Sequence, residues 1–454
     1  MVVVAKVRRI FHFYLFIFLL FIIFALEMNQ ATLDFIRANA EADVRQLALQ
    51  GTKNPEVDLT FALEQIAGRQ KAKTKLPSWA ATDGIVYPPH LSMEQCSSEQ
   101  TARYKALIAG KGALVVDLTA GFGVDMAFIS QHFQKAVHVE RQAQLCTISS
   151  QNYKHLGLNH IEVICADGVD YLHQLDHADL IFLDPARRDN HGARTYGIAD
   201  CTPNVLELRD ELLQKTDRVM LKLSPMLDWR KAVEDLDHVS EVHIVSVDNE
   251  CKELLVVLEE SGKVFVERGK RKEEREYSVH CVNLLSNGGK EEFKFCDADI
   301  SLTSHLSPLT SISHLSPLTS HLLYEPNASI MKAGCFAALE QRFGVQQLDK
   351  NSHLFVADHD ISDFPGRRFV IEKTTSMNKR ELKAALDGID RANITVRNFP
   401  MSVAELRKRL KLKDGGDLFL FATTVAGNQH QLFLCRKIEY YGAPTTFHPK
   451  SLAV

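Results

Sequence analysis

The chain has 454 residues, a length that predicts two or three domains. Its formal net charge of -4 excludes a uniformly basic surface, so any nucleic-acid binding must come from local patches. The nine cysteines form no Cys-x-x-Cys pair, which favours reduced thiols in a cytosol over a disulfide framework or a zinc site. We therefore expect no bound metal.

An apolar run from Ile10 to Leu26 follows the basic residues Lys6, Arg8 and Arg9. Such a run is typical of a signal-peptide core or a short membrane anchor. It is also very rich in Phe and Ile, as translated non-coding sequence can be, and we favour a misassigned start with Met28 as the initiator. Residues 1–27 are then an apolar extension, and the protein is expected in the cytoplasm without stable membrane association.

Residues 28–110 are predicted to form a helical N-terminal region. Near its end, Ser97 and Gln100 fit a capping box, so a helix is expected to begin there and to run toward the first strand. This capped end either only starts a helix or also borders the ligand pocket of the following domain.

The stretch from Val115 to Asp125 organises the rest of the chain. The apolar run 113–116 predicts a buried parallel strand that ends at Asp117. A turn with Gly121 and Gly123 follows. Glycines at a strand-to-helix turn let the backbone approach a ligand closely, and the amino end of the next helix offers free N–H groups.

Two ligands compete for this turn, a dinucleotide and S-adenosylmethionine. The dinucleotide fingerprint requires a third glycine three residues after Gly123, where this chain has Met126. The dinucleotide fingerprint is therefore broken within the helix predicted over 124–133, and the pattern from Asp117 to Gly123 instead resembles the first motif of class I S-adenosylmethionine-dependent methyltransferases. A dinucleotide-dependent oxidoreductase remains a distant alternative.

Alternating strands and helices continue to about residue 223 and predict a doubly wound parallel sheet. The expected strands are residues 136–140, 161–165, 179–183 and 218–223, and the expected helices are residues 142–156 and 203–215. Two further strands, 241–247 and 252–258, are joined by a short polar turn and predict an antiparallel hairpin. Together they define an α/β core over residues 111–260.

Four acidic residues stand where predicted parallel strands end: Asp117, Glu140, Asp167 and Asp184. Ligands of such sheets lie across the carboxyl ends of the strands, where carboxylates can accept hydrogen bonds from ribose hydroxyls, an adenine amino group or an ammonium group. The alternative is that these are four independent turn residues.

The chain changes character after residue 260. Residues 261–375 are expected to form an α+β domain with strands at 263–267 and 276–282 and a helix at 330–343, interrupted by a low-complexity insertion at 302–321 that contains a duplicated segment. Residues 376–454 form a last compact segment. A capping box at Ser402 and Glu405 opens a basic helix there.

Four segments together resemble a bacterial group of class I S-adenosylmethionine-dependent methyltransferases. They are Asp117–Gly123, Asp184–Arg188, Tyr324–Ala328 and the segment after residue 376. The resemblance implies a Rossmann-like methyltransferase core, a ferredoxin-like domain over 261–375 and a THUMP-like domain over 376–454.

The same resemblance implies an enzyme with S-adenosylmethionine as its cofactor. It assigns Glu140 to the ribose hydroxyls, Asp167 to the adenine, and Gly121 and Gly123 to the methionyl part, with Asp117 beside them. THUMP domains accompany RNA-modifying enzymes, so the predicted function is methylation of RNA at an acceptor atom that the sequence does not name.

The segment from Asp184 to Arg187 is predicted to be catalytic. It lacks the second proline and the stacking aromatic of base-amino methyltransferases, and the fifth strand offers no cysteine for carbon methylation. A simple displacement remains, in which Asp184 orients the acceptor or takes its proton, and Arg187 and Arg188 hold a phosphate. A surface salt bridge is the alternative for both arginines.

Four cations of the basic helix and the residues just after it have the charge and the placement for phosphate contacts: Arg407, Lys408, Lys411 and Lys413. An ordinary solvated face is the alternative. Two other functions stay open for the whole chain, a methyltransferase for a small molecule or a protein, and a non-catalytic protein that binds RNA or cofactor.

Overall fold

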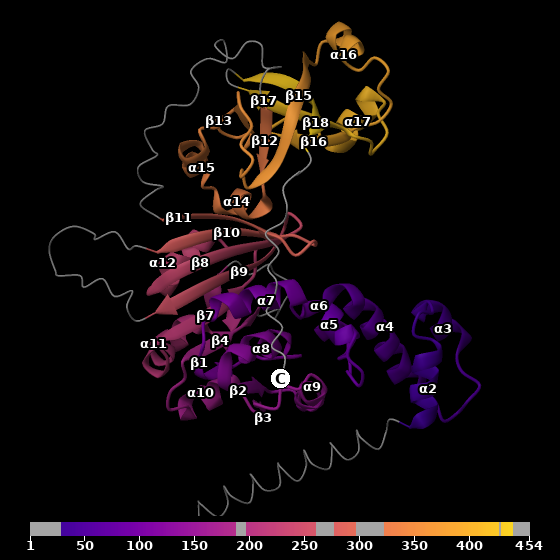
Figure 1. Ribbon diagram of the computed structural model, residues 1–454, viewed down its shortest axis with the longest axis vertical. Helices are drawn as coiled ribbons and strands as arrows, with labels where there is room; N and C mark the ends of the chain where they lie inside the picture. Colours follow the sequence, from indigo (N-terminus) through magenta and orange to yellow (C-terminus); the bar gives the residue numbers. More distant parts are fainter. Residues whose placement is uncertain (1–28, 188–196, 260–276, 297–321, 426–427, 439–454) are drawn as a thin grey trace, which may run out of the picture. The chain divides into compact units, whose positions relative to one another are not determined.

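The computed structural model describes residues 29–187, 197–259, 277–296, 322–425 and 428–438 (Figure 1). The apolar run before Met28, the predicted strand at 263–267 and the insertion at 302–321 lie outside these residues. Among the described residues, no helix combines the length and the apolar composition that a bilayer span requires.

The chain divides into two compact units. The first consists of Met1–Leu223, Glu234–His238 and Val257–Ser261, and the second of Ser224–Val233, Val239–Val256 and Gly262–Val454. Each unit is described by itself below.

Helices precede the first strand, in agreement with the predicted helical region: α2 (Gln30–Ala38), α3 (Val44–Gln50), α4 (Leu59–Lys75), α5 (Pro77–Ala80), α6 (His90–Gln95) and α7 (Glu99–Ile108). The predicted capping box at Ser97 is wrong by one residue. Ser98 is the N-cap of α7 and accepts a hydrogen bond from the N–H of Thr101, while the Ser97 hydroxyl turns to Asp125 instead.

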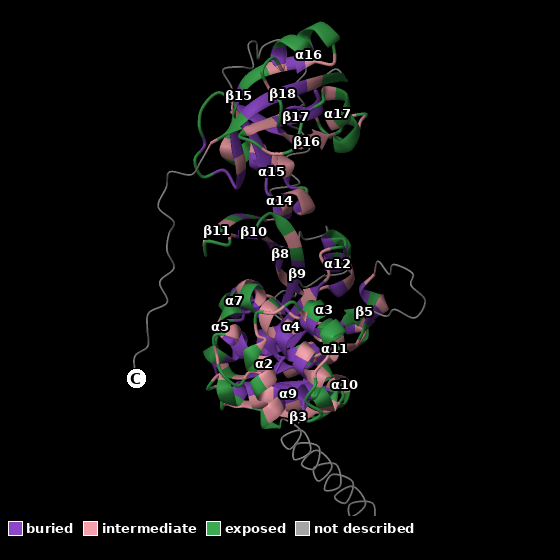
Figure 2. Cartoon of the chain, turned by 90° about the vertical axis from the view of Figure 1, so that its right-hand side faces the viewer, coloured by how far each residue is buried: buried purple, intermediate pink, exposed green. Residues whose placement is uncertain are grey.

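The first unit contains a parallel sheet whose strands follow the order β7-β4-β1-β2-β3. These strands are β1 (Gly112–Asp117), β2 (Phe133–Glu140), β3 (Ile161–Cys165), β4 (Leu180–Leu183) and β7 (Arg218–Leu223). The strands β1, β2, β4 and β7 are mainly apolar because both faces of the parallel sheet are covered there, whereas β3, at the edge of the sheet, is only partly buried. Figure 2 colours each described residue by its burial.

Helices and short elements connect these strands: α8 (Val124–Ile129), η1 (Ser130–His132), α9 (Ala143–His155), α10 (Gly168–Gln174), β5 (Ala186–Arg187), η2 (Ile198–Asp200), β6 (Cys201–Thr202) and α11 (Val205–Lys215). The helix α12 (Trp229–Leu236) follows β7. The helix predicted over 124–133 is shorter than expected because β2 already begins at Phe133.

The predicted hairpin is present as β8 (Val239–Val247) and β9 (Glu250–Glu259). Asp248 and Asn249 join the strands with φ of 46° and 66°, the left-handed conformation that a two-residue hairpin turn needs. The end of β9, Val257–Glu259, belongs to the first unit and is the next strand beyond β7. The predicted α/β sheet that ends in an antiparallel hairpin is thus confirmed.

The second unit extends β8 with two more strands, in the order β11-β10-β8-β9. The strand β10 (Ser278–Leu284) runs parallel to β8, and β11 (Lys290–Cys296) runs antiparallel to β10. The sequence analysis did not predict β11.

A separate sheet in the second unit has the order β13-β14-β12-β15-β18-β17-β16. Its strands are β12 (Leu322–Pro326), β13 (Gln346–Gln347), β14 (Phe355–Ala357), β15 (Gly366–Ser376), β16 (Asn393–Arg397), β17 (Leu418–Val425) and β18 (Gln429–Lys437). Its helices are α14 (Ala328–Ala333), α15 (Phe336–Phe343), α16 (Lys379–Ala385) and α17 (Val403–Leu410). The single helix predicted over 330–343 is wrong, because Gly334 adopts the left-handed conformation and ends α14.

The segment Tyr324–Ala328 has structural tasks within this unit. The Tyr324 hydroxyl donates to the carbonyl of His359. The carboxylate of Glu325 is buried and pairs with Arg367 and Arg397. Asn327 caps α14. These structural contacts account for the tyrosine, the acid and the asparagine of this segment, so no catalytic role is needed to explain them.

Candidate active site

The turn after β1 is held by the carboxylate at the end of β2. Glu140 Oε2 accepts the N–H of Gly121 at 3.0 Å, and Oε1 accepts the N–H of Gln142 at 2.8 Å. Gly121 has φ of 56°, and a Cβ built there would have no heavy atom closer than 4.0 Å, the carbonyl oxygen of Thr119. The backbone at Gly121 therefore faces open space, as the predicted close approach of a ligand requires.

Gly123 is required for a different reason. It has φ of 82°, and a Cβ would lie 2.1 Å from the hydroxyl oxygen of Tyr153. That hydroxyl donates to the Gly123 carbonyl at 3.1 Å and lies 2.8 Å from Nδ1 of His138, which then donates to it. The buried side chains of Tyr153 and His138 thus hold the turn in place from the interior of the unit.

Acid should weaken this support, because burial lowers the pKa of His138 from 6.5 to about 3. Between those values the unfolded chain binds a proton that the folded chain excludes, so stability present above pH 6.5 is lost as the pH falls. His138 alone should lower the free energy of unfolding by about 1.4 kcal/mol per pH unit. Urea unfolding of the wild type and of His138→Asn across this range measures the difference. Parallel pH profiles for the two proteins would contradict the assignment.

The turn after β3 comes close to the turn after β1. A Cβ on Gly168 would lie 2.1 Å from the carbonyl oxygen of Leu118, so only glycine permits this approach. Asp167, just before it, caps α10 by accepting the N–H of Val169 at 2.9 Å. Its carboxylate is exposed and lies at the end of β3, beside β2.

Asp117 is the most deeply placed of the four strand-end acids. Its carboxylate is buried and accepts the N–H of Thr119 at 2.9 Å. Burial raises the pKa of Asp117 well above its usual range, and the nearby carboxylates of Asp125, Asp184 and Glu140 raise it further. Three of the four predicted strand-end acids thus converge on one region.

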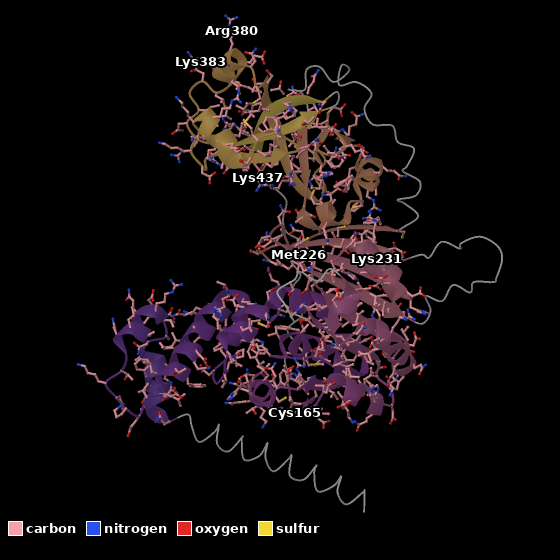
Figure 3. All side chains as sticks on the ribbon, turned by 180° about the vertical axis from the view of Figure 1, so that it is seen from behind. Cys165, Met226, Lys231, Arg380, Lys383 and Lys437 are labelled. Atoms are coloured by element: carbon pink, nitrogen blue, oxygen red, sulfur yellow. The ribbon has the colours of Figure 1, made fainter. Side chains whose placement is uncertain are left out.

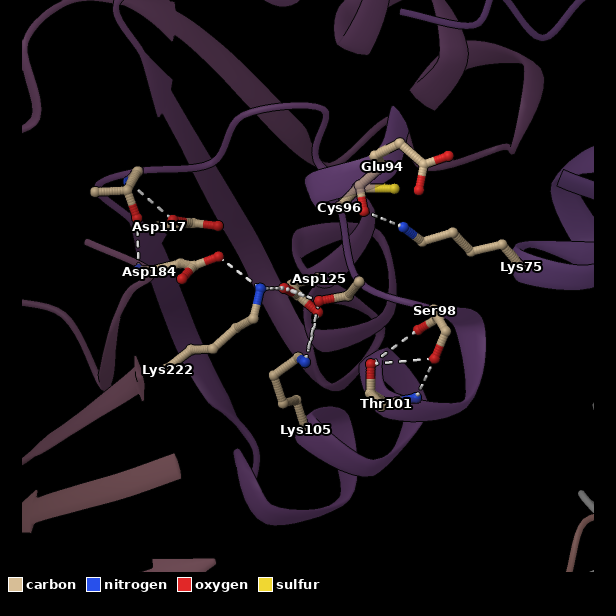
Figure 4. A network of polar contacts seen from close by, with 12 residues as sticks. Lys75, Glu94, Cys96, Ser98, Thr101, Lys105, Asp117, Asp125, Asp184 and Lys222 are labelled. Atoms are coloured by element: carbon tan, nitrogen blue, oxygen red, sulfur yellow. Dashed lines mark hydrogen bonds and ion pairs between the residues drawn. The ribbon is translucent and has the colours of Figure 1, made fainter. Parts of the chain in front are cut away.

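A chain of charges leads from the end of β4 into the interior (Figure 4). Lys222, on β7, places its Nζ 2.6 Å from Oδ2 of Asp184 and 3.9 Å from Oδ2 of Asp125. The Nζ of Lys105 lies 3.2 Å from Oδ1 of Asp125, and the Ser97 hydroxyl donates to Oδ2 at 2.7 Å. Asp184 has 40% of its side chain exposed, whereas Lys105 has none. The buried part of the network therefore holds the accessible carboxylate of Asp184 in position.

These contacts keep Asp125 charged although it is buried. Burial on its own raises its pKa, but Lys105, Lys222 and Ser97 outweigh that effect, so the net direction of the pKa is downward. Asp125, Lys222 and Lys105 were not among the site residues predicted from the sequence. Asp125 follows the glycine turn and Lys222 lies at the end of a strand, so their positions alone could have indicated site residues. Nothing in the sequence pattern of α7 indicates that Lys105 is buried.

The remaining predicted site residues belong to other elements or lie outside the described part of the chain. Arg187 pairs through its backbone with Cys201 in the β5–β6 ribbon, and Arg188 lies outside the described residues. Arg407 is tied down by contacts to the carbonyl of Ala392 and to Asp414. The remaining predicted cations of the basic segment, Lys408, Lys411 and Lys413, are exposed.

A solved structure matches nearly the whole chain. A crystal structure from Porphyromonas gingivalis W83, of a protein assigned as a methyltransferase, is 32% identical, covers 90% of this chain and 98% of that chain, and superimposes with a TM-score of 0.77. The chain belongs to this methyltransferase family. The predicted class I S-adenosylmethionine-dependent methyltransferase fold and enzyme class are confirmed.

Family models match three parts of this methyltransferase. A model of protein-L-isoaspartate (D-aspartate) O-methyltransferase matches residues 91–189, a ferredoxin-like domain matches residues 322–365, and a THUMP domain-like model matches residues 366–437. No curated protein matches the chain.

Two further solved structures match about a third of this chain. An rRNA methylase from Streptococcus thermophilus is 21% identical and covers 35% of this chain and 93% of that chain, with a TM-score of 0.27. A protein from Streptococcus mutans assigned as a methyltransferase, solved with SAH, is 16% identical and covers 36% and 96% of the two chains, also with a TM-score of 0.27.

Proposed function

We propose that this methyltransferase transfers a methyl group from S-adenosylmethionine to RNA. The observation that carries the cofactor half of the proposal is the meeting of Glu140, Asp117 and the glycine turn at the carboxyl ends of the sheet strands. Asp167, Gly121 and Gly123 complete the proposed cofactor site, and S-adenosylmethionine would supply a methyl group on a positively charged sulfur.

The donor set at Glu140 suits a ribose. Each carboxylate oxygen has two lone pairs, and each accepts one backbone N–H, so each keeps one lone pair for a further donor. Two adjacent hydroxyls on one ribose match two acceptors on one carboxylate. The open space above Gly121 allows the ligand to pass close to the backbone.

We assign the acceptor end to Asp184, with Lys222 as its positioning partner. The acceptor forms a bond to the methyl carbon as the carbon–sulfur bond breaks, and the acceptor's proton passes to the Asp184 carboxylate and then to solvent. Lys222 fixes the orientation of that carboxylate at 2.6 Å. Arg187, three residues further on, would hold a phosphate of the acceptor.

RNA is favoured as the acceptor by the THUMP-like match and by cations on that segment. Lys408, Lys411 and Lys413 are exposed at and beyond the end of α17. The helix α16 adds Arg380 and Lys383, whose side chains project from the unit in Figure 3. Contacts from such side chains to phosphates release counterions and give salt-dependent affinity.

The test is transfer of tritiated methyl groups to RNA from cells that lack the gene. We expect incorporation, and we expect Lys408→Gln/Lys411→Gln/Lys413→Gln to weaken RNA binding and to lower the slope of log affinity against log salt by about 0.7 to 0.9 per lost contact. The exposed triple variant Lys53→Gln/Lys111→Gln/Lys135→Gln is the charge-matched control. Equal RNA binding by the two triple variants would contradict the assigned RNA surface.

A protein acceptor is the second candidate, since the model of protein-L-isoaspartate O-methyltransferases matches residues 91–189. This match includes the residues of the proposed cofactor site and Asp184. It does not include the segments matched by the ferredoxin-like and THUMP-like models. Methyl incorporation into protein but not into RNA would favour this candidate, and incorporation into neither would favour a non-catalytic binding protein.

A further inference from the structure

A cluster of histidine and carboxylate side chains lies on one face of the strands β8, β10 and β11 of the second unit. Glu241 and His243 are two residues apart on β8, so they point to the same side of the sheet. The parallel register places His280 of β10 beside His243, and Ser278 beside Glu241. One potential ligand atom from each of Glu241, His243 and His280 lies within 4.8 Å of the other two.

The two imidazole rings are stacked, with centroids 4.4 Å apart and planes 20° from parallel. Nε2 of His243 lies 2.9 Å from a carboxylate oxygen of Glu241. His243 is buried, with 2% of its side chain exposed, whereas Glu241 and His280 are partly open to solvent with 29% and 13%. An ion could therefore enter from the side of Glu241 while His243 stays packed.

A further carboxylate fixes the state of His280. Its Nδ1 lies 2.8 Å from Oε1 of Glu292, so it donates its ring proton there. Its Nε2 then carries the lone pair and accepts from the Ser278 hydroxyl at 3.0 Å. A carboxylate that orients the far nitrogen of a histidine is the arrangement found behind histidines that bind metals.

We propose that Glu241, His243 and His280 bind a first-row divalent transition metal ion such as Zn²⁺. Two imidazole nitrogens and one carboxylate oxygen form a common ligand set for this ion, with a fourth position left for water. Binding turns the Ser278 hydroxyl away from His280 and releases to solvent the proton shared between His243 and Glu241. Glu241 and Glu292 supply negative charge beside the ion, although the Nζ of Lys290 lies 2.6 Å from Oε2 of Glu292.

No sequence pattern indicates this cluster, and the proposed site runs against our expectation of no bound metal. Zinc sites are recognised in sequences by closely spaced ligands. Here His243 and His280 are brought together only by the parallel pairing of β8 with β10, across a long connection. The proposal does not depend on the methyltransferase activity or on its cofactor.

Co²⁺ and Zn²⁺ titrations of the intact chain, stripped with chelator, test the proposal. We expect one Co²⁺ ion per chain with visible d–d bands and no thiolate charge-transfer band, displaced by one Zn²⁺. His280→Gln and Glu241→Gln should each remove the stoichiometric bands, and Glu292→Gln should weaken affinity about 10- to 100-fold. The matched control is His359→Gln, which changes an exposed histidine that lies 2.8 Å from Asp358.

Circular dichroism of each variant separates a lost site from a lost fold, and Glu292 is exposed enough that its variant is expected to fold. Bands that persist in both His280→Gln and Glu241→Gln would overturn the proposal. So would a thiolate charge-transfer band in the wild type, which would move the ion to cysteine, or no Co²⁺ binding by the folded wild type.

Discussion

Asp184→Asn is expected to lower the methyl-transfer rate about 10²- to 10⁴-fold, the range for loss of a positioned proton acceptor. Asparagine keeps the size of the side chain, but it cannot take a proton and it loses the charge that Lys222 contacts at 2.6 Å. Cofactor affinity should change little, because Asp184 lies on the acceptor side of the proposed site. Single-turnover transfer, alongside calorimetric cofactor binding, measures both quantities.

The control for Asp184→Asn is Asp176→Asn, the same change at an exposed position before β4. It should transfer methyl groups at the wild-type rate. A rate for Asp184→Asn within about threefold of wild type would remove Asp184 from the reaction, because a proton acceptor contributes far more than that. A matching loss of cofactor affinity would instead make it a binding residue.

Asp125→Asn is expected to lower the free energy of unfolding by about 3–5 kcal/mol, the range for breaking a buried ion pair from one side. Lys105 has no exposed side-chain surface, and Asp125 is the carboxylate 3.2 Å from its Nζ. Asparagine removes the negative charge that lies beside this buried ammonium. Chemical denaturation of the variant and the wild type at one salt concentration measures the loss.

The double variant Asp125→Leu/Lys105→Met distinguishes a buried charge from lost packing. It removes both charges at similar volume, and replacing a buried pair by apolar groups is often close to neutral. We therefore expect it to be more stable than Asp125→Asn. A double variant that is less stable than Asp125→Asn would show that packing around the pair, and not the broken charge pair, accounts for the loss.

The parts of the fold that could be predicted are those set by local pattern. Apolar runs that end in an acid, such as the one before Asp117, mark buried strands, and Gly121 and Gly123 mark a turn whose left-handed backbone conformation favours glycine. The proximity of Asp117, Glu140 and Asp184 could also be predicted, because the carboxyl ends of parallel strands lie at one edge of a sheet.

The parts that could not be predicted depend on contacts distant in sequence. Ser98 and not Ser97 caps α7, since Ser97 is used by Asp125, 28 residues away. A lysine in a helix is expected at the protein surface. Lys105 is buried beside the Asp125 carboxylate because α7 packs against α8. Four of the seven residues of β11 are charged, so its composition does not mark it as a strand, and its pairing with β10 places it in the sheet.

Isothermal titration of the intact protein with S-adenosylmethionine tests the central claim most directly. We predict that one molecule binds per chain and that Glu140→Gln weakens binding about 10- to 100-fold, as expected for loss of a charged hydrogen-bond acceptor. Glu162→Gln, an exposed change on β3, should bind like the wild type. No heat from the folded wild type at millimolar S-adenosylmethionine, or equal affinity in Glu140→Gln, would contradict the claim that these strand ends hold the cofactor.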